Sequence, residues 1–459
     1  MNLTVPAVLC GVALGVAYTL SPLTVVALAS ILLACQWAVR GASDAERRWL
    51  VATLLVAITL RLAAIAGLFL TADPNIPYGN FFGDEEFFKR KTTWLRNVAM
   101  GIPISTADFI YAFDKTGDNG YVTLLTFIQA IFGLAPYGIH VFNAACYVVA
   151  ALLLYVPARQ AFGGLAALMG LIILLFLPSL FFWSISALKE PAYFLVAAVN
   201  LIAALALARG RVWWRQIPGI AVIALCALAL QSLREGGLAL AGGGVLGGVT
   251  LSFLLKRKWL FASTLAAAPV VAVLALRRVA VQERVWALVH EAAMKHWGHI
   301  NTAGQTYRLM DGQFYLDRAA VAAMTGGDAV RYVARAIWSY VMVPLPWQIE
   351  SRSAFAFVPE QLAWLLLLVL AVTGLATALR RDRLFTSLLL AHALVAALLV
   401  AVSGGNIGTL VRHRGLAMPY LSWLAGVGVV MVGQRLLWGP RAWRPDSSLT
   451  DSKAALQWH

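Results

Sequence analysis

Residues 361–402 read QLAWLLLLVLAVTGLATAL, then RRDR, then LFTSLLLAHALVAALLVAV. The first and third pieces carry no Lys, Arg, Asp or Glu. Each is long enough to cross the roughly 30 Å hydrocarbon core of a bilayer at about 1.5 Å per helical residue. The basic piece between them is long enough only for a turn. The segment therefore predicts two antiparallel membrane helices, and it sets the fold class for the rest of the chain.

The composition of the whole chain agrees with this prediction. Of its 459 residues, 61% are hydrophobic and 12% are charged, whereas roughly 25% of the residues of a soluble domain are charged. A chain this apolar cannot be covered by its own polar surface in water. The composition excludes a disordered chain, a collagen-like fibre, a disulfide-stapled secreted domain and a soluble nucleic-acid binder.

Apolar runs of similar length recur along the chain and predict an all-α polytopic membrane protein. We expect a membrane domain over residues 1–437 with about twelve transmembrane helices, followed by a cytoplasmic tail over 438–459. The expected spans are 4–20, 22–39, 49–71, 137–157, 163–182, 190–208, 217–233, 237–255, 259–276, 361–379, 384–402 and 416–437. Two long loops, 72–136 and 277–360, separate them.

The basic residues predict an orientation. With the N-terminus in the cytoplasm, seventeen Lys and Arg residues fall in the cytoplasmic loops and tail. The short outer loops hold only Lys189, Arg234, Arg412 and Arg414. This asymmetry follows the positive-inside rule and explains much of the formal net charge of +15. We therefore expect no nucleic-acid partner, cytoplasmic N- and C-termini, an inner (plasma) membrane location and two long periplasmic loops.

The long loops carry amphipathic segments of their own. Residues 121–134 are apolar but too short to span, which predicts an interfacial or re-entrant helix. Residues 277–297 repeat with helical period, with Val281, Val285 and Leu288 on one face. Residues 328–343 form a second helical stretch before a proline-rich turn. The two loops are the expected carriers of function.

The densest acidic group is Asp84-Glu85-Glu86, just after the third expected span. Adjacent carboxylates repel, so one of them needs a raised pKa or a cationic partner. Such a carboxylate is a candidate general base for an acceptor hydroxyl or amine, with Asp84 and Glu85 as the candidates. A solvated acidic loop is the alternative.

Several basic residues lie at positions that the positive-inside rule does not explain. Arg61 lies in the middle of an expected span, where a charge is costly and is by default functional or buried and paired. Lys189-Glu190 and Arg234 lie at outer turns, where a cation can hold a phosphate; surface Lys–Glu and Arg–Glu pairs are the alternative.

Two further stretches are candidate binding sites. The last outer loop runs from Gly404 to Arg412-His413-Arg414, and its two arginines and glycine-rich backbone are typical of an anion site. Tyr307-Arg308 in the second long loop could face a sugar. The histidines of that loop lack metal-ligand spacing, so we assign no metal ligands.

The sequence has no phosphate-binding P-loop, no GxGxxG pattern that follows a strand and no GxSxG pattern. This argues against an ATP-driven pump and against a soluble nucleotide-sugar domain. The candidate acidic and basic residues and the two long loops are expected at one face of a membrane bundle. A substrate with a phosphate and a polar head at that face, and a lipid tail in the bilayer, fits such a site.

Several short motifs then resemble the lipid-linked-sugar glycosyltransferases of the GT-C superfamily, of the mannosyl- and aminoarabinose-transferase type. They are Asp84-Glu85, Phe142-Asn143, Leu177-Pro178, the ALKEP stretch at 187–191, the PLPW turn at 344–347, and Arg412-His413-Arg414 with Pro419. Two extra apolar segments near the start, and the lack of a large soluble C-terminal domain, depart from that family's pattern. The second departure favours a glycan or lipid acceptor over a polypeptide.

The resemblance implies an inverting transfer of a sugar from a polyprenyl-phosphate-linked donor. Asp84 or Glu85 would be the base, and Lys189, Arg412 and Arg414 would bind the leaving phosphate. Arg61 would support the carboxylates, and loop 277–360 would shape the acceptor site. Some members hold a divalent cation with loop carboxylates, so a divalent cation is allowed here. A polysaccharide repeat-unit polymerase and a transporter or flippase of a lipid-linked sugar are the alternatives; a transporter predicts inverted repeats, and the sequence has none.

Overall fold

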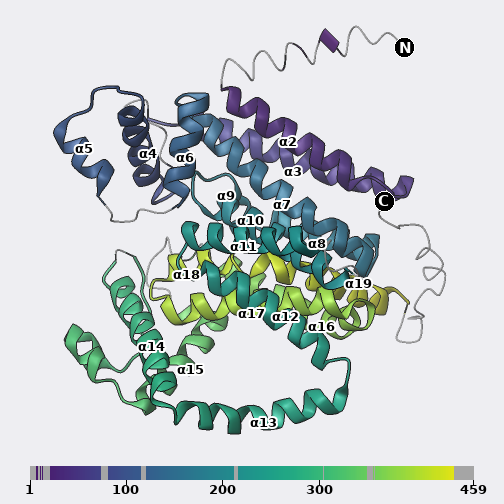
Figure 1. Cartoon of the computed structure of the whole chain (residues 1–459). Helices are drawn as coiled ribbons and strands as arrows, with labels where there is room; N and C mark the ends of the chain where they lie inside the picture. The colour runs from purple at the N-terminus through teal and green to yellow at the C-terminus, as the bar shows by residue number, and fades with distance from the viewer. Residues whose placement is uncertain are drawn as a thin grey trace.

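Figure 1 shows the chain as a computed structural model, which describes residues 7–8, 11, 13, 21–73, 81–114, 120–210, 216–302, 304–348, 355 and 357–438. These residues are almost entirely helical, and no strand occurs among them. One antiparallel bridge, between Thr306 and Asn406, is the sole extended pairing in this part of the chain. The all-α prediction is therefore confirmed.

The helices follow one another with short connections. They are α2 (Pro22–Ala38), α3 (Asp44–Leu70), α4 (Glu85–Ala99), α5 (Thr106–Phe113), α6 (Gly120–Phe132), α7 (Pro136–Phe162), α8 (Gly164–Phe176), α9 (Pro178–Ser184), α10 (Glu190–Arg209), α11 (Ile217–Leu233), α12 (Gly237–Leu254), α13 (Lys258–Leu276), α14 (Val279–Ile300), α15 (Gly326–Met342), α16 (Phe357–Arg381), α17 (Arg383–Ser403), α18 (Ile407–Arg414) and α19 (Met418–Trp438). Short 3-10 helices, η2 (Gly312–Tyr315), η3 (Arg318–Ala323) and η4 (Pro346–Gln348), flank α15.

Eight of the described helices are long and apolar enough to cross a membrane: α3, α7, α10, α12, α13, α16, α17 and α19. The bent pair α8 and α9 makes a ninth if its two pieces form one span. The expected spans at 22–39 and 217–233 coincide with α2 and α11, which are shorter apolar helices of 17 residues. The expected span at 4–20 lies largely outside the described residues. The chain is thus a multi-pass membrane protein.

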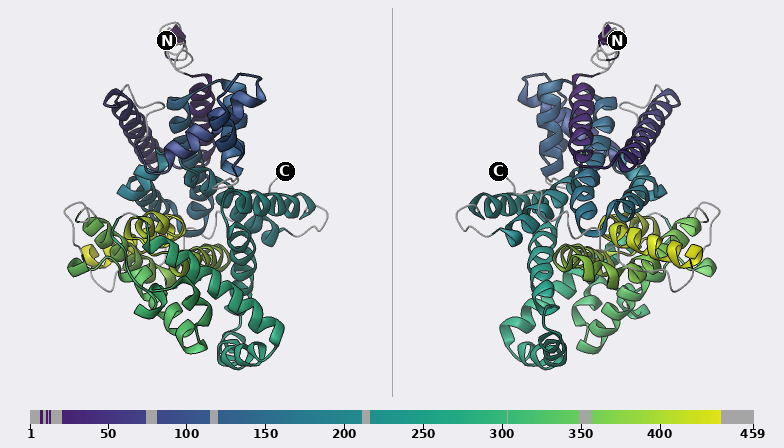
Figure 2. Two further views of the ribbon diagram at one scale, coloured as in Figure 1. Left: turned by 90° about the vertical axis from the view of Figure 1, so that its left-hand side faces the viewer. Right: turned by 90° about the vertical axis from the view of Figure 1, so that its right-hand side faces the viewer.

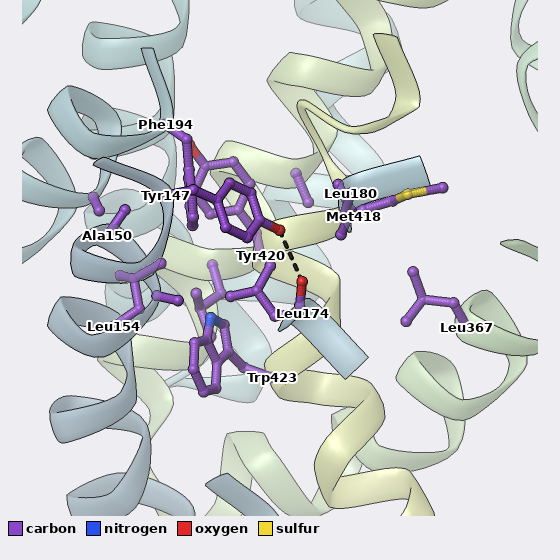
Figure 3. Close-up of a cluster of buried hydrophobic side chains, with 14 of the residues drawn as sticks. Tyr147, Ala150, Leu154, Leu174, Leu180, Phe194, Leu367, Met418, Tyr420 and Trp423 are labelled. Atoms are coloured by element: carbon purple, nitrogen blue, oxygen red, sulfur yellow. Dashed lines mark hydrogen bonds between the residues drawn. The ribbon is translucent and has the colours of Figure 1, made fainter. Parts of the chain in front are cut away.

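The expected continuous span at 163–182 is instead two helices that meet at 65°. The break follows from Pro178, which has no N–H to donate to the carbonyl four residues earlier. That carbonyl, of Leu174, accepts a hydrogen bond from the Tyr147 hydroxyl at 2.8 Å (Figure 3). The next carbonyl, of Leu175, accepts from Arg61 Nη2 at 2.9 Å. Two side chains from other helices therefore stabilise a helix break inside the bundle.

Close helix contacts hold the bundle together. The helix α7 is buried along most of its length, and α19 packs against α16 and α8. The α16–α19 contact requires a residue without a side chain, because a Cβ on Gly428 would lie 2.0 Å from the Leu370 carbonyl oxygen. In the views of Figure 2, the purple and blue N-terminal helices form the upper part of the molecule and the green and yellow C-terminal helices the lower part.

Both long loops contribute helices at the same end of the bundle, the left-hand end in Figure 1. We call this end, with α4–α6, α14, α15 and α18, the loop end. The helix expected within 121–134 is present as α6, and those expected at 277–297 and 328–343 are α14 and α15. The face of α14 that carries Val281, Val285 and Leu288 is exposed, and α13 has no buried residue. These apolar surfaces suit contact with lipid.

Candidate functional site

Five charged residues from four distant segments meet at the loop end; we call them the charged cluster. They are Asp84, Lys189, Glu190, Arg234 and Arg412. The guanidinium of Arg412 lies at the centre. It donates to Glu190 Oε1 from Nε at 2.9 Å and from Nη2 at 2.6 Å, and to Asp84 Oδ2 from Nη1 at 3.1 Å. One arginine therefore joins the start of α4, the start of α10 and the short helix α18.

Local structure explains these positions. Glu190 occupies the first turn of α10 and is followed by Pro191, an arrangement that suits a helix N-terminus because the helix dipole favours an anion there. Asn406 begins α18 and accepts a hydrogen bond from the Thr409 amide at 3.2 Å. Arg234 ends α11 in an extended conformation, and Gly236 then reverses the chain into α12 with a φ of 83°. Each cluster residue outside α18 thus stands at or next to a helix end.

The charged cluster holds three cations against two carboxylates. Glu190 is approached by Arg234 Nη1 at 3.9 Å as well as by Arg412. The Lys189 side chain forms no hydrogen bond and no ion pair with another described residue, and burial, followed by the nearby Arg234, lowers its pKa. For Arg412, burial opposes the charge, but Glu190 and Asp84 together outweigh burial, so its pKa is raised. The cluster therefore contains one cation, Lys189, that can accept an anionic partner.

His413 lies beside this cluster and stays neutral at pH 7. Burial, with the positive charges of Arg234 and Arg412, holds the pKa of its imidazole well below the ordinary value. Its ring has no hydrogen bond to another described residue. A neutral imidazole offers one donor and one acceptor, so His413 can bind a polar group without adding charge.

A cavity opens next to the charged cluster, between α7, α9, α10 and the α18–α19 connection. It is partly open to solvent. Glu190 and Arg412 line it together with five aromatic residues, Tyr147, Trp183, Tyr193, Phe194 and Tyr420. The Arg412 guanidinium lies over the Trp183 ring, 5.1 Å from its centroid. Figure 3 shows Tyr147, Phe194 and Tyr420 close together in this region.

The three consecutive carboxylates at 84–86 have three different environments. The side chains of Asp84 and Glu86 are 66% and 63% exposed, whereas that of Glu85 is fully buried. Within this run Asp84 alone joins the charged cluster. Glu86 lies 4.0 Å from Arg90 at the surface of α4.

Glu85 belongs to a buried polar network that holds the turn before α10. Its Oε1 accepts from the Ala187 amide, and its Oε2 accepts from Lys89 Nζ at 3.2 Å. Lys89 also lies 2.8 Å from His140 Nε2, while His140 Nδ1 contacts the Ile185 carbonyl at 2.6 Å. A carbonyl can only accept, so the His140 proton is on Nδ1 and Nε2 accepts from Lys89. Glu85 therefore fixes backbone rather than facing the cavity.

Two of the other predicted arginines lie away from the charged cluster. Besides Leu175, Arg61 donates to the Ala57 carbonyl and to Ser184 Oγ, at 3.1 and 2.8 Å, and contacts no carboxylate of a described residue. Arg414 is fully buried, and its donors go to the Tyr340 and Val343 carbonyls and to Gln361 Oε1. The expected support of the carboxylates by Arg61 and the expected phosphate contact of Arg414 find no counterpart in this geometry, because each guanidinium is buried and binds backbone carbonyls and an uncharged side chain instead.

Tyr307 and Arg308 join the second long loop to the last one. The Tyr307 amide donates to the Gly405 carbonyl at 3.0 Å. A Cβ on Gly404 would lie 2.6 Å from the Tyr307 hydroxyl, so the glycine permits this approach. The Tyr307 hydroxyl is buried, whereas the exposed Arg308 guanidinium lies 5.4 Å from the Tyr315 ring centroid. Neither residue contacts the charged cluster.

Sequence reasoning missed the aromatic residues of the cavity. Tyr193 and Phe194 follow Glu190 by three and four positions, which places them on the same helix face. That spacing was the available signal.

Among the described residues, no three His, Cys, Asp or Glu side chains come close enough to hold a metal ion. No family model matches the chain, and no match was found among curated proteins or solved structures.

Proposed function

We propose that the protein is a membrane glycosyltransferase that moves a sugar from a polyprenyl-phosphate-linked donor to a glycan or lipid acceptor at the loop end. One observation carries the proposal. Arg412 joins Asp84 to Glu190 at an aromatic cavity within a bundle of membrane helices, and Lys189 beside it forms no ion pair with another described residue. This combines an anion site, an exposed carboxylate and an amphipathic cavity.

The cations suit the phosphate of the donor. Lys189 offers three donors on a flexible stem, and Arg234 lies close to it. Positive charge that is already in place before the reaction stabilises the negative charge that develops on a leaving phosphate, and it does so most strongly where water is excluded. In this proposal Lys189 and Arg412 hold the phosphate, and Arg234 adds to the local positive charge.

Asp84 is the base in the proposed reaction. The acceptor hydroxyl oxygen forms a bond to the anomeric carbon, and the carbon–oxygen bond to the phosphate breaks. The hydroxyl proton passes to the Asp84 carboxylate, and the bonding electron pair leaves with the phosphate. Asp84 is exposed enough to meet an acceptor, and its bond to Arg412 fixes its direction. Glu85 positions the neighbouring turn.

The proposed orientation places the loop end outside the cell. With the N-terminus in the cytoplasm and about twelve spans, α2, α11 and residues 4–20 would complete the crossings. The two long loops would then be periplasmic, and both termini cytoplasmic in the inner membrane. The GT-C-like layout belongs to this proposal. A divalent cation belongs to it only as an addition, because Arg412 already bridges the two cluster carboxylates.

The test uses purified protein in liposomes, a radiolabelled polyprenyl-phosphate sugar and a membrane glycolipid extract. Wild type is compared with Asp84→Asn and with Glu86→Gln, a control at an equally exposed neighbouring carboxylate. We expect label in a new product with wild type and Glu86→Gln, and none with Asp84→Asn. An active Asp84→Asn variant would refute the role of Asp84. Lipid crossing the bilayer without transfer would favour a flippase, and transfer that requires two lipid-linked glycans would favour a polymerase.

A further inference from the structure

The aromatic cavity contains polar atoms that have no partner. Glu190 Oε2 is buried and has no hydrogen bond to another described residue, although Oε1 of the same carboxylate binds Arg412. Tyr193 and Tyr420 line the same cavity, and neither hydroxyl bonds to another described residue. The third tyrosine of the lining, Tyr147, has its hydroxyl occupied by the Leu174 carbonyl.

Such atoms restrict what can fill the cavity. A buried polar group without a partner costs roughly 1–3 kcal/mol, so native structures rarely leave one empty. Among the described residues that line the cavity, Glu190 Oε2 is the buried atom that bears this cost, and an isoprenoid chain, which has no donor or acceptor, would leave it and the two tyrosine hydroxyls unpaired. A ligand with hydroxyl groups at its edge would pair them. The apolar faces of the cavity must be covered at the same time.

We infer that this cavity binds the sugar of the lipid-linked donor, an assignment that rests on the function proposed above. A sugar ring has apolar C–H faces and a rim of hydroxyl groups. The rings of Trp183 and Phe194 supply flat apolar surfaces, and Glu190 Oε2 accepts from a sugar hydroxyl. The Tyr193 and Tyr420 hydroxyls donate to or accept from the others. The carboxylate of Glu190 disfavours a negatively charged sugar.

This arrangement fits the charged cluster around it. Arg412 and Glu190 belong to both the cluster and the cavity lining. A sugar inside the cavity would place its anomeric phosphate at the mouth, beside Lys189. The exposed Asp84 would then meet the acceptor on the open side. The isoprenoid chain would lie along the lipid-facing surface of the bundle rather than inside the cavity.

The test compares the binding of two lipids by wild type and by single-hydroxyl variants. Dissociation constants are measured in nanodiscs for a polyprenyl-phosphate sugar and for the bare polyprenyl phosphate. The variants are Tyr193→Phe and Tyr420→Phe, with Tyr111→Phe as a control in α5, outside the cavity. We expect each cavity variant to bind the sugar-bearing lipid about 5- to 10-fold more weakly, the loss of one hydrogen bond, and to bind the bare lipid unchanged.

The outcomes separate the two levels of inference. Equal weakening for both lipids, or no weakening for either, would overturn the sugar assignment and leave the proposed transferase intact. If wild type binds neither lipid, the proposed function fails, and the sugar assignment fails with it. Weakening by Tyr111→Phe to the same degree would show an effect unrelated to the cavity and would also overturn the assignment.

Discussion

Replacement of Glu85 by glutamine should strongly destabilise the fold, although the two side chains have nearly the same shape. The carboxylate is fully buried and accepts three hydrogen bonds, from Lys89 and from the Ala187 and Phe81 amides. Glutamine can keep the carbonyl contact with Ala187. Its amide nitrogen would then face two donors, Lys89 Nζ and the Phe81 N–H, and can accept from neither.

The magnitude follows from those two lost bonds. Hydrogen bonds to charged groups contribute about 1.5–3 kcal/mol each, and removal of one partner of a buried ion pair costs about 3–5 kcal/mol. We therefore expect Glu85→Gln to lower the free energy of unfolding by about 4 kcal/mol. The exposed Glu86→Gln should change it by less than about 0.5 kcal/mol. Removal of the stranded charge in Glu85→Gln/Lys89→Met should cost less than the two single changes together.

The assay is reversible unfolding in mixed micelles of SDS and a mild detergent, with these three variants and the single variant Lys89→Met beside wild type. Hydrogen exchange of the Phe81 amide provides a local readout, because that amide loses its acceptor in Glu85→Gln. Exchange there should rise relative to Glu86→Gln. If Glu85→Gln unfolds at the same SDS fraction as Glu86→Gln, the network contributes no net stability and the reasoning is wrong.

Three further predictions concern the site and the helix break. Arg412→Lys cannot hold Asp84 and Glu190 together, so transfer should fall at least 10-fold while the protein remains folded; unchanged transfer would exclude Arg412 from the site. The pKa of Lys189 is lowered from its ordinary value of 10.5, so the binding of bare polyprenyl phosphate should weaken as the pH rises and Lys189 loses its proton. Lys189→Arg should move this weakening to higher pH, because arginine keeps its charge. An unchanged pH profile of binding in Lys189→Arg would assign the pH dependence to another group. Arg61→Met leaves the Leu175 carbonyl without its donor and should lower the free energy of unfolding by about 1–3 kcal/mol in the same assay. The dissociation constant for bare polyprenyl phosphate should not change. A changed dissociation constant would show that Arg61 contributes to the binding site.

Hydrophobic runs predicted the helices well but could not predict where one of them breaks. An average over residues 163–182 does not register Pro178, although a proline inside an apolar run marks a lost N–H. The partners that satisfy the freed carbonyls, Arg61 and Tyr147, come from α3 and α7. A charge in the middle of a span signalled that Arg61 is bound to something polar, and the structure identifies backbone carbonyls as that partner. The sequence alone shows that Arg61 needs a polar partner but does not identify that partner.

The basic residues at the outer turns were the sequence signal for the site, and the structure shows that only some of them belong to it. Lys189, Arg234 and Arg412 all oppose the expected charge asymmetry, and the three meet around Glu190. Arg414 carries the same signal and lies elsewhere. Helix geometry accounts for the difference. Successive residues are rotated by about 100° around the helix axis, so two residues that are two positions apart lie on nearly opposite sides of the helix. Within α18 only one of the two arginines could reach the carboxylates. The other, Arg414, binds the end of α15 and helps to hold that helix in place. A pair of arginines at this spacing is thus better explained by two separate contacts than by one doubly charged anion site.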